Sequence, residues 1–75
     1  MDHILEYERL VCSIANRYRY YADFEDLKQE GMKGLLKAVE KYVPNPNTKF
    51  STYASFWIRG EILDFLGKDK NIKIL

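Results

Sequence analysis

One stretch of the chain, residues 43–48, concentrates the residues that interrupt helices. Its sequence, VPNPNT, contains two prolines and two asparagines. Proline lacks an amide donor and restricts the residue before it, so such a stretch ends a helix and forms a loop. Because apolar residues recur at helical spacing on both sides of this loop, the sequence predicts an all-α fold. We expect a compact bundle of about three helices that forms a single domain over residues 1–75.

The segment just before the loop predicts a helix from about Asp23 to Tyr42. Aspartate commonly caps the exposed amides of a helix start, and further acidic residues follow it. The apolar stripe of this helix is Leu27, Gly31, Gly34, Leu35, Ala38 and Tyr42. Each glycine costs about 1 kcal/mol relative to alanine in a helix interior. We therefore expect another helix backbone to approach closely at Gly31 and Gly34.

Two further helices complete the expected bundle. One spans residues 2–20, and its short connection at residues 21–22 predicts an antiparallel neighbour. The other begins at Ser51 or Thr52, which are good helix caps, and ends near Gly67. The expected buried face of this last helix is Ala54, Ile58, Ile62 and Phe65.

The composition excludes several classes of protein. Cys12 is the only cysteine and His3 the only histidine, so no internal disulfide and no zinc cluster are expected. Neither a nucleophile–base pair nor a glycine-rich phosphate motif is evident. No apolar run approaches the ~20 residues of a membrane span, and the chain does not start like a signal peptide. We therefore expect a cytoplasmic protein that is not an enzyme, needs no cofactor or metal, and gains support from a partner.

The side of the second helix that faces away from its apolar stripe is mostly polar. Its residues are Asp26, Gln29, Glu30, Met32, Lys33 and Leu36. Spacing alone favours an ordinary solvated face. However, Met32 and Leu36 place apolar groups beside charges, which is typical of a protein-docking surface.

The segment after the loop is rich in aromatic residues. If Ala54, Ile58 and Ile62 face the core, the outward-facing residues are Thr52, Tyr53, Phe56, Trp57 and Gly60. Exposed aromatic rings can stack on unpaired bases, each worth ~1–3 kcal/mol, and Lys49 and Arg59 can hold phosphates. The alternative is that the rings complete the core of a small domain. Composition does not separate these two interpretations, and both can hold in part.

Three motifs in the chain resemble the second conserved region of the sigma-70 family of bacterial RNA polymerase sigma factors. They are DLKQEG at residues 26–31, GLLKA at 34–38 and KFSTYASFWIR at 49–59. The family pattern is D-L-x-Q-E-G-x-x-G-L-x-K-A, followed after about ten residues by K-F-S-T-Y-A-x-x-W-I-R. The motifs are long and specific, and the match covers nearly the whole chain without a gap between the blocks.

The resemblance implies a helical module of transcription initiation. In this family the second helix docks on the clamp helices of the β′ subunit of RNA polymerase. The matching residues here are Asp26, Gln29, Glu30, Met32 and Leu36. The third helix recognises and melts the promoter minus-ten element by capturing flipped bases of the non-template strand. The residues implied for this DNA contact are Tyr42, Lys49, Phe50, Ser51, Thr52, Tyr53, Phe56, Trp57, Arg59 and Gly60.

The chain departs from primary sigma factors at several positions. Phe56 stands where they carry the first of two tryptophans, and Gly60 where they carry a polar residue. The sequence RGEI at residues 59–62 is more similar to alternative sigma factors of the sporulation or flagellar type. Nothing resembles a reader of the minus-thirty-five element, so we expect an excised domain or one piece of a two-subunit sigma factor. The alternative is a regulatory fragment that binds polymerase or an anti-sigma factor without reading DNA.

Overall fold

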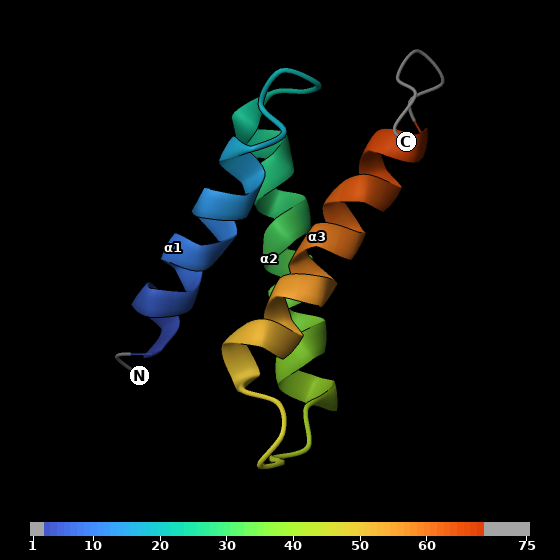
Figure 1. Ribbon diagram of the computed structural model, residues 1–75. Helices are drawn as coiled ribbons and strands as arrows, with labels where there is room; N and C mark the ends of the chain where they lie inside the picture. Colours follow the sequence, from blue (N-terminus) through green and yellow to red (C-terminus); the bar gives the residue numbers. More distant parts are fainter. Residues whose placement is uncertain (1–2, 69–75) are drawn as a thin grey trace.

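The computed structural model describes residues 3–68, which form three α-helices (Figure 1). Helix α1 spans His3–Asn16, α2 spans Phe24–Lys41 and α3 spans Phe50–Lys68. Helix α2 runs antiparallel to α1 and to α3 and contacts both. The all-α prediction is thus confirmed, and the prediction of one domain over residues 1–75 includes ends that lie outside the described residues. None of these three helices is long and apolar enough to cross a membrane.

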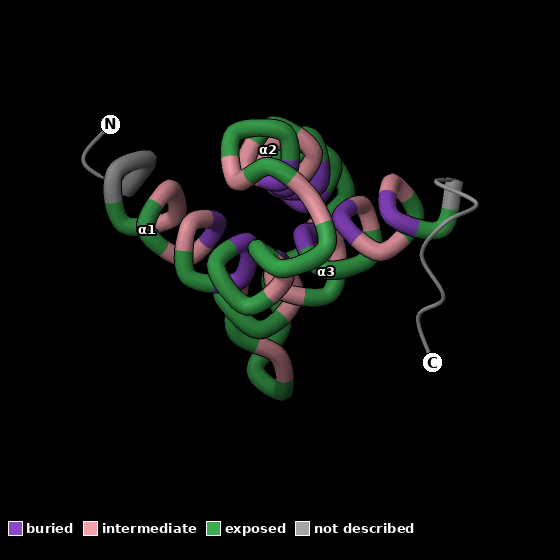
Figure 2. The backbone as a smooth tube through the Cα atoms, turned by 90° about the horizontal axis from the view of Figure 1, so that it is seen from above, coloured by how far each residue is buried: buried purple, intermediate pink, exposed green. Residues whose placement is uncertain are grey.

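The core lies where the inner faces of the three helices meet (Figure 2). Its members are Val11, Ile14, Ala15, Leu27, Leu35, Ala38, Ala54, Ile58, Ile62 and Leu66. The predicted stripe of α2 is confirmed, since Leu27, Leu35, Ala38 and both glycines are buried and Tyr42 is half-buried. Among residues 6–67, whose side-chain burial the structure describes, no polar or charged residue is buried. The fold therefore depends on apolar burial and on the close fit of small residues.

The two buried glycines of α2 let neighbouring helices come close. A Cβ atom at Gly34 would lie 2.7 Å from the Cα of Ile58 and closer still to the carbonyl oxygen of Trp57. A Cβ at Gly31 would lie 2.7 Å from a methyl group of Val11 and 3.2 Å from one of Ile58. Gly34 thus contacts the α3 backbone and Gly31 contacts side chains from α1 and α3. The predicted close approach of another helix backbone is thus confirmed at Gly34, whereas at Gly31 side chains rather than backbone make the close contacts.

The helix ends differ from the sequence predictions. Helix α1 ends at Asn16 rather than Tyr20, because the amides of Arg17 and Tyr18 bond to carbonyls three residues back and tighten the last turn. Asp23 is the N-cap residue of α2, but its side chain makes no capping hydrogen bond. Instead its carbonyl accepts the amide of Leu27 at 3.1 Å, which starts the helix.

Helix α3 begins earlier and ends later than predicted. The amide of Tyr53 bonds to the carbonyl of Lys49 at 3.1 Å, so Ser51 and Thr52 lie within the first turn rather than at the cap. Gly67 was expected to end the helix but lies inside it. A glycine commonly ends a helix by adopting a positive φ, and no described glycine has a positive φ. The buried face continues to Leu66, and Phe65 is only half-buried.

The predicted loop joins α2 to α3 and is held together by its own polar groups. An isolated antiparallel bridge pairs Asn45 with Thr48. The amide of Asn47 donates to Oδ1 of Asn45 at 2.7 Å, and the Tyr42 hydroxyl donates to the carbonyl of Thr48 at 2.6 Å. Tyr42 therefore ties the end of α2 to the strand-like segment that leads into α3.

Candidate functional site

Five aromatic rings from α1, α2's end and α3 form a continuous set of contacts, which we call the aromatic row. The ring centroids of Tyr7 and Phe50 lie 4.8 Å apart, and those of Phe50 and Tyr42 lie 5.2 Å apart. Tyr42 lies 5.3 Å from Tyr53, which lies 6.3 Å from Trp57. Every member is half-buried. The row therefore closes one end of the core and also presents ring surface to solvent.

Phe56 differs from the aromatic row because its side chain points outward. It is 63% exposed, although it lies next to Trp57 in the same helix. The guanidinium carbon of Arg59 lies 5.7 Å from the Phe56 ring centroid, and Nζ of Lys41 lies 5.8 Å from that of Trp57. Phe50 and Trp57 pack against the core, as the core-completing interpretation predicts, whereas Phe56 faces outward beside a cation and leaves its ring accessible.

A cavity of about 290 Å³ opens beside the aromatic row, where α2 meets the loop. It is lined by Lys41, Tyr42, Val43, Asn45, Thr48 and Tyr53. Two aromatic rings, an amide and a lysine give it both stacking surface and hydrogen-bonding groups, which suits a planar heterocycle. Sequence reasoning missed Val43, Asn45 and Thr48 as members of this site. The available signal was a turn-forming segment directly after Tyr42.

The other residues predicted to touch DNA lie along the first half of α3 and at its start. Lys49, Ser51, Thr52 and Gly60 are all exposed. Ser51 has a structural task as well, because its carbonyl accepts a hydrogen bond from the Ser55 hydroxyl at 2.8 Å. A Cβ at Gly60 would meet no atom within 4 Å, so this glycine leaves an open stretch of helix surface rather than a packing notch.

The residues predicted to dock on a protein lie along α2 and differ in exposure. Asp26, Gln29 and Leu36 are exposed, and Glu30 and Met32 are half-buried. Met32 packs against the core while keeping part of its surface accessible. The structure therefore places all five on the surface of one helix, with Leu36 the most prominent apolar member at 62% exposure.

Sequence reasoning missed two exposed valines that extend this surface. Val39 is 60% exposed and Val43 is 74% exposed. Met32, Leu36 and Val39 follow one another at spacings that share a side of a helix, and Val43 continues the line just beyond the end of α2. We call these four residues the apolar strip. Their spacing could have identified them, since each one directly follows a residue of the predicted apolar stripe of the same helix.

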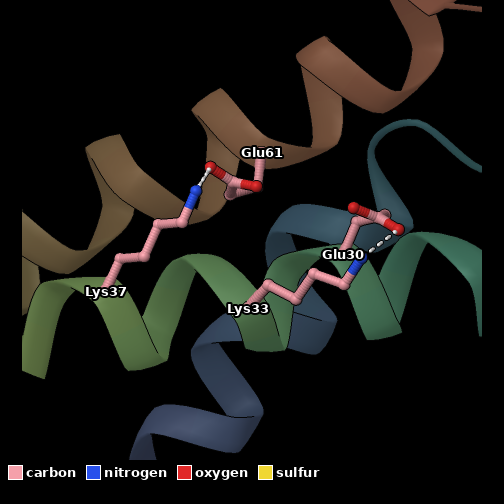
Figure 3. Close-up of polar contacts among 4 residues, drawn as sticks. All are labelled: Glu30, Lys33, Lys37 and Glu61. Carbon is pink, nitrogen blue, oxygen red and sulfur yellow. Dashed lines mark hydrogen bonds and ion pairs between the residues drawn. The ribbon is translucent and has the colours of Figure 1, made fainter.

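An ion pair joins α2 to α3 (Figure 3). Nζ of Lys37 lies 2.7 Å from Oε2 of Glu61, and nearby Nζ of Lys33 lies 3.1 Å from Oε2 of Glu30. The hydrogen bond to Glu61 raises the pKa of the Lys37 ammonium above its ordinary value of 10.5, with partial desolvation opposing it. The negative charges of Glu61, Asp64 and Glu30 add to the increase in this pKa. Because Lys37 is exposed, the pair orients the two side chains more than it stabilises the fold.

Comparison with known proteins identifies similar sequences. Residues 3–72 match the family model described as Sigma-70 region 2. The chain is similar to RNA polymerase sigma factor SigA of a Bacillus species, with 58% identity over 55 residues that cover 72% of this chain and 15% of the relative. It is similar to sigma factor SigA2 of Synechococcus elongatus, with 53% identity over 55 residues, 72% of this chain and 17% of the relative. The chloroplastic sigma factor sigF of Arabidopsis thaliana is 49% identical over 55 residues, 72% of this chain and 10% of its own length.

These relatives are much longer than the matched region. The chain spans only 10–17% of the length of the three curated relatives described above. No solved structure matches the chain.

Proposed function

Because this chain belongs to the sigma-70 family and matches its region 2 over most of its length, we propose that it acts in transcription initiation as a DNA-binding module of RNA polymerase. In this proposal the chain docks on the β′ clamp helices of core polymerase and binds the promoter minus-ten element. It performs no chemical reaction. The alternative type of sigma factor and the cytoplasmic location remain predictions.

The observation that carries the DNA-binding part is the exposure of Phe56 beside Arg59. A phenylalanine ring that is 63% exposed leaves apolar surface in water that a stacked base would bury. A cation held over its ring gives the same spot affinity for a polyanion. Unpaired bases stack on such rings whatever their sequence, and the phosphates between them suit the arginine.

We propose that melting is driven by capture of bases that have left the duplex. Unstacking a base costs a few kcal/mol, and stacking on a protein ring returns ~1–3 kcal/mol. Phe56 provides an exposed stacking surface, and the half-buried rings of Tyr53 and Trp57 offer further ring surface on the same helix. A flipped base of the non-template strand fits the cavity beside Tyr42 and Tyr53, where hydrogen-bonding groups of the loop can discriminate between bases. No nucleotide hydrolysis is needed for this opening.

The geometry of α2 supports simultaneous contact with two partners. The apolar strip and the exposed residues Asp26 and Gln29 offer a mixed apolar and polar surface, which is typical of a protein interface. Lys37 and Lys41 lie on a different flank of the same helix, toward α3 and the aromatic row. Polymerase can therefore contact Leu36 and Val39 while DNA approaches Lys41 and the aromatic row.

A pair of single substitutions with matched exposure tests the proposal. Phe56 and Leu36 are 63% and 62% exposed, so truncating either to alanine should leave stability nearly unchanged. We expect Phe56→Ala to weaken binding of a single-stranded minus-ten oligonucleotide about tenfold, within the range for loss of one stacked ring, and to retain polymerase binding. Leu36→Ala should show the reverse pattern. Fluorescence anisotropy with core polymerase, at stated salt, measures both.

Two results would contradict the proposal in different ways. If Phe56→Ala binds the oligonucleotide as well as the original chain, the exposed ring does not stack on DNA. If the original chain binds polymerase but shows no sequence preference, it is the regulatory fragment rather than a promoter reader. The double substitution of Tyr53 and Trp57 is a poorer test, because both side chains pack against the core and their loss would also destabilise the fold.

A further inference from the structure

A second cavity, of about 150 Å³, lies between the end of α1 and the middle of α3. Ser13 lines it from α1, Arg17 and Tyr18 line it from the turn that follows α1, and Ser55 and Arg59 line it from α3. Its volume corresponds to about five water molecules at ~30 Å³ each, which is enough for a phosphate group with some hydration. No aspartate or glutamate contributes to the lining. The cavity therefore combines two positive charges, one from the turn after α1 and one from α3, with no acidic residue in its lining.

Backbone and side-chain hydrogen bonds fix two parts of the cavity wall, the turn that carries Arg17 and the Ser55 hydroxyl. The amide of Arg17 donates to the carbonyl of Ile14 at 3.1 Å, which fixes the turn that follows α1. The Ser55 hydroxyl donates its hydrogen bond to the carbonyl of Ser51, so it lines the cavity without donating to a ligand. Leu10 provides part of an apolar floor. The guanidinium groups are the strong donors that remain for a ligand.

The two arginines differ from a neighbouring arginine in their partners. Within residues 3–68, neither the Arg17 nor the Arg59 guanidinium makes an ion pair or a hydrogen bond to the protein, whereas Arg19 donates to Oδ1 of Asn16 at 3.1 Å. Arg59 also lies over the Phe56 ring, so the cavity is continuous with the proposed stacking surface. A ligand that bridges ring and cavity needs a flat group for the ring and an anionic group for the arginines, and a nucleotide carries both.

We propose that Arg17 and Arg59 jointly bind one phosphodiester group of the DNA strand whose bases stack on Phe56. This inference rests on the proposed function and adds a positioning residue, Arg17, that the motifs do not include. Guanidinium groups bind phosphate oxygens through paired hydrogen bonds, and two of them from different segments of the chain fix the direction in which the strand leaves the ring. The strand is then held at a base and at a backbone group, which sets its register on α3.

The test compares Arg17→Ala with Arg19→Ala, in the full chain bound to core polymerase. Both variants lose one positive charge from the same turn, but only Arg17 lines the cavity. We expect Arg17→Ala to weaken binding of the single-stranded oligonucleotide about tenfold and Arg19→Ala to weaken it less than about twofold. The slope of log affinity against log salt should fall by about 0.7 for Arg17→Ala, as for one lost phosphate contact on a single strand.

A modified oligonucleotide identifies the phosphate. Replacing one phosphodiester at a time by an uncharged methylphosphonate should locate a single position at which Arg17→Ala and Arg59→Ala have no further effect. Equal behaviour of Arg17→Ala and Arg19→Ala would overturn the inference, as would the absence of any such position. Full competition by inorganic phosphate at millimolar concentration would also overturn it, in favour of a site for a free anion.

The outcomes separate this inference from the proposed function. If binding depends on Arg17 but not on Phe56, Arg17 binds a phosphate, but that phosphate does not belong to a strand stacked on Phe56. The stacking proposal then fails. If binding depends on Phe56 but treats Arg17 and Arg19 alike, the stacking proposal stands and this inference fails.

Discussion

Replacing Gly34 by alanine should destabilise the domain more than any surface change discussed above. The added methyl group would lie 2.7 Å from the Cα of Ile58 and closer to the carbonyl oxygen of Trp57. Both atoms belong to the backbone of α3, so no side-chain rotation can relieve the clash. Helices α2 and α3 would have to move apart at their crossing.

The size of the effect follows from two opposing contributions. Alanine is favoured over glycine by about 1 kcal/mol in a helix interior. Overpacking typically costs ~1–3 kcal/mol, and a clash with backbone belongs at the upper end. The net loss is therefore about 2 kcal/mol, which lowers Tm by roughly 8–16 °C in a domain of this size.

The same substitution at Gly60 is the matched control. A Cβ there meets no atom within 4 Å, and the position is an exposed helix interior. Gly60→Ala should therefore raise the free energy of unfolding by about 0.5–1 kcal/mol. Urea unfolding followed by far-UV circular dichroism measures all three proteins. If Gly34→Ala proved as stable as Gly60→Ala, the close contact between α2 and α3 would be refuted.

Two further perturbations test the α2 surface and the α2–α3 ion pair. Gln29→Ala combined with Glu30→Ala should weaken retention of core polymerase in a pull-down. The free energy of unfolding should change by no more than a few tenths of a kcal/mol. Unchanged retention would count against docking through α2. Glu61→Gln should lower the urea midpoint at pH 7, because the raised pKa of Lys37 means that its pair stabilises the fold while Lys37 is protonated. That contribution is present below the ordinary pKa of 10.5 and is lost as pH rises through the higher folded value, so the two proteins should converge above pH 10.5. A difference that does not shrink at high pH would mean that the ion pair is not its cause.

Much of the core was predictable because small and apolar residues leave clear spacing patterns. The stripe of α2 and the close approach at Gly31 and Gly34 follow from residue size alone. Helix ends were less predictable, because they depend on which carbonyl each amide reaches. The Lys49 carbonyl, which accepts the Tyr53 amide, sets the start of α3 ahead of the better capping residues Ser51 and Thr52.

The candidate site was only partly predictable for a similar reason. The motif at residues 49–59 indicated which aromatic residues to examine, but not that Phe56 faces outward while Phe50 and Trp57 pack inward. Local spacing cannot decide this, since it depends on where α1 and α2 lie against α3. Arg17 was missed because it lies in a turn far from the motif and meets Arg59 only in the folded chain.

The arrangement of the three helices also has a consequence for the order of folding. The interface of α2 with α3 is the most extensive of the three, and these helices are neighbours in sequence, joined by residues 42–49. Such local contacts close early, because little chain entropy is lost in forming them. Helix α1 makes the smaller interfaces, so it is expected to dock last and to detach first. Because Tyr7 of α1 packs on Phe50 at 4.8 Å, each detachment would uncover one end of the aromatic row.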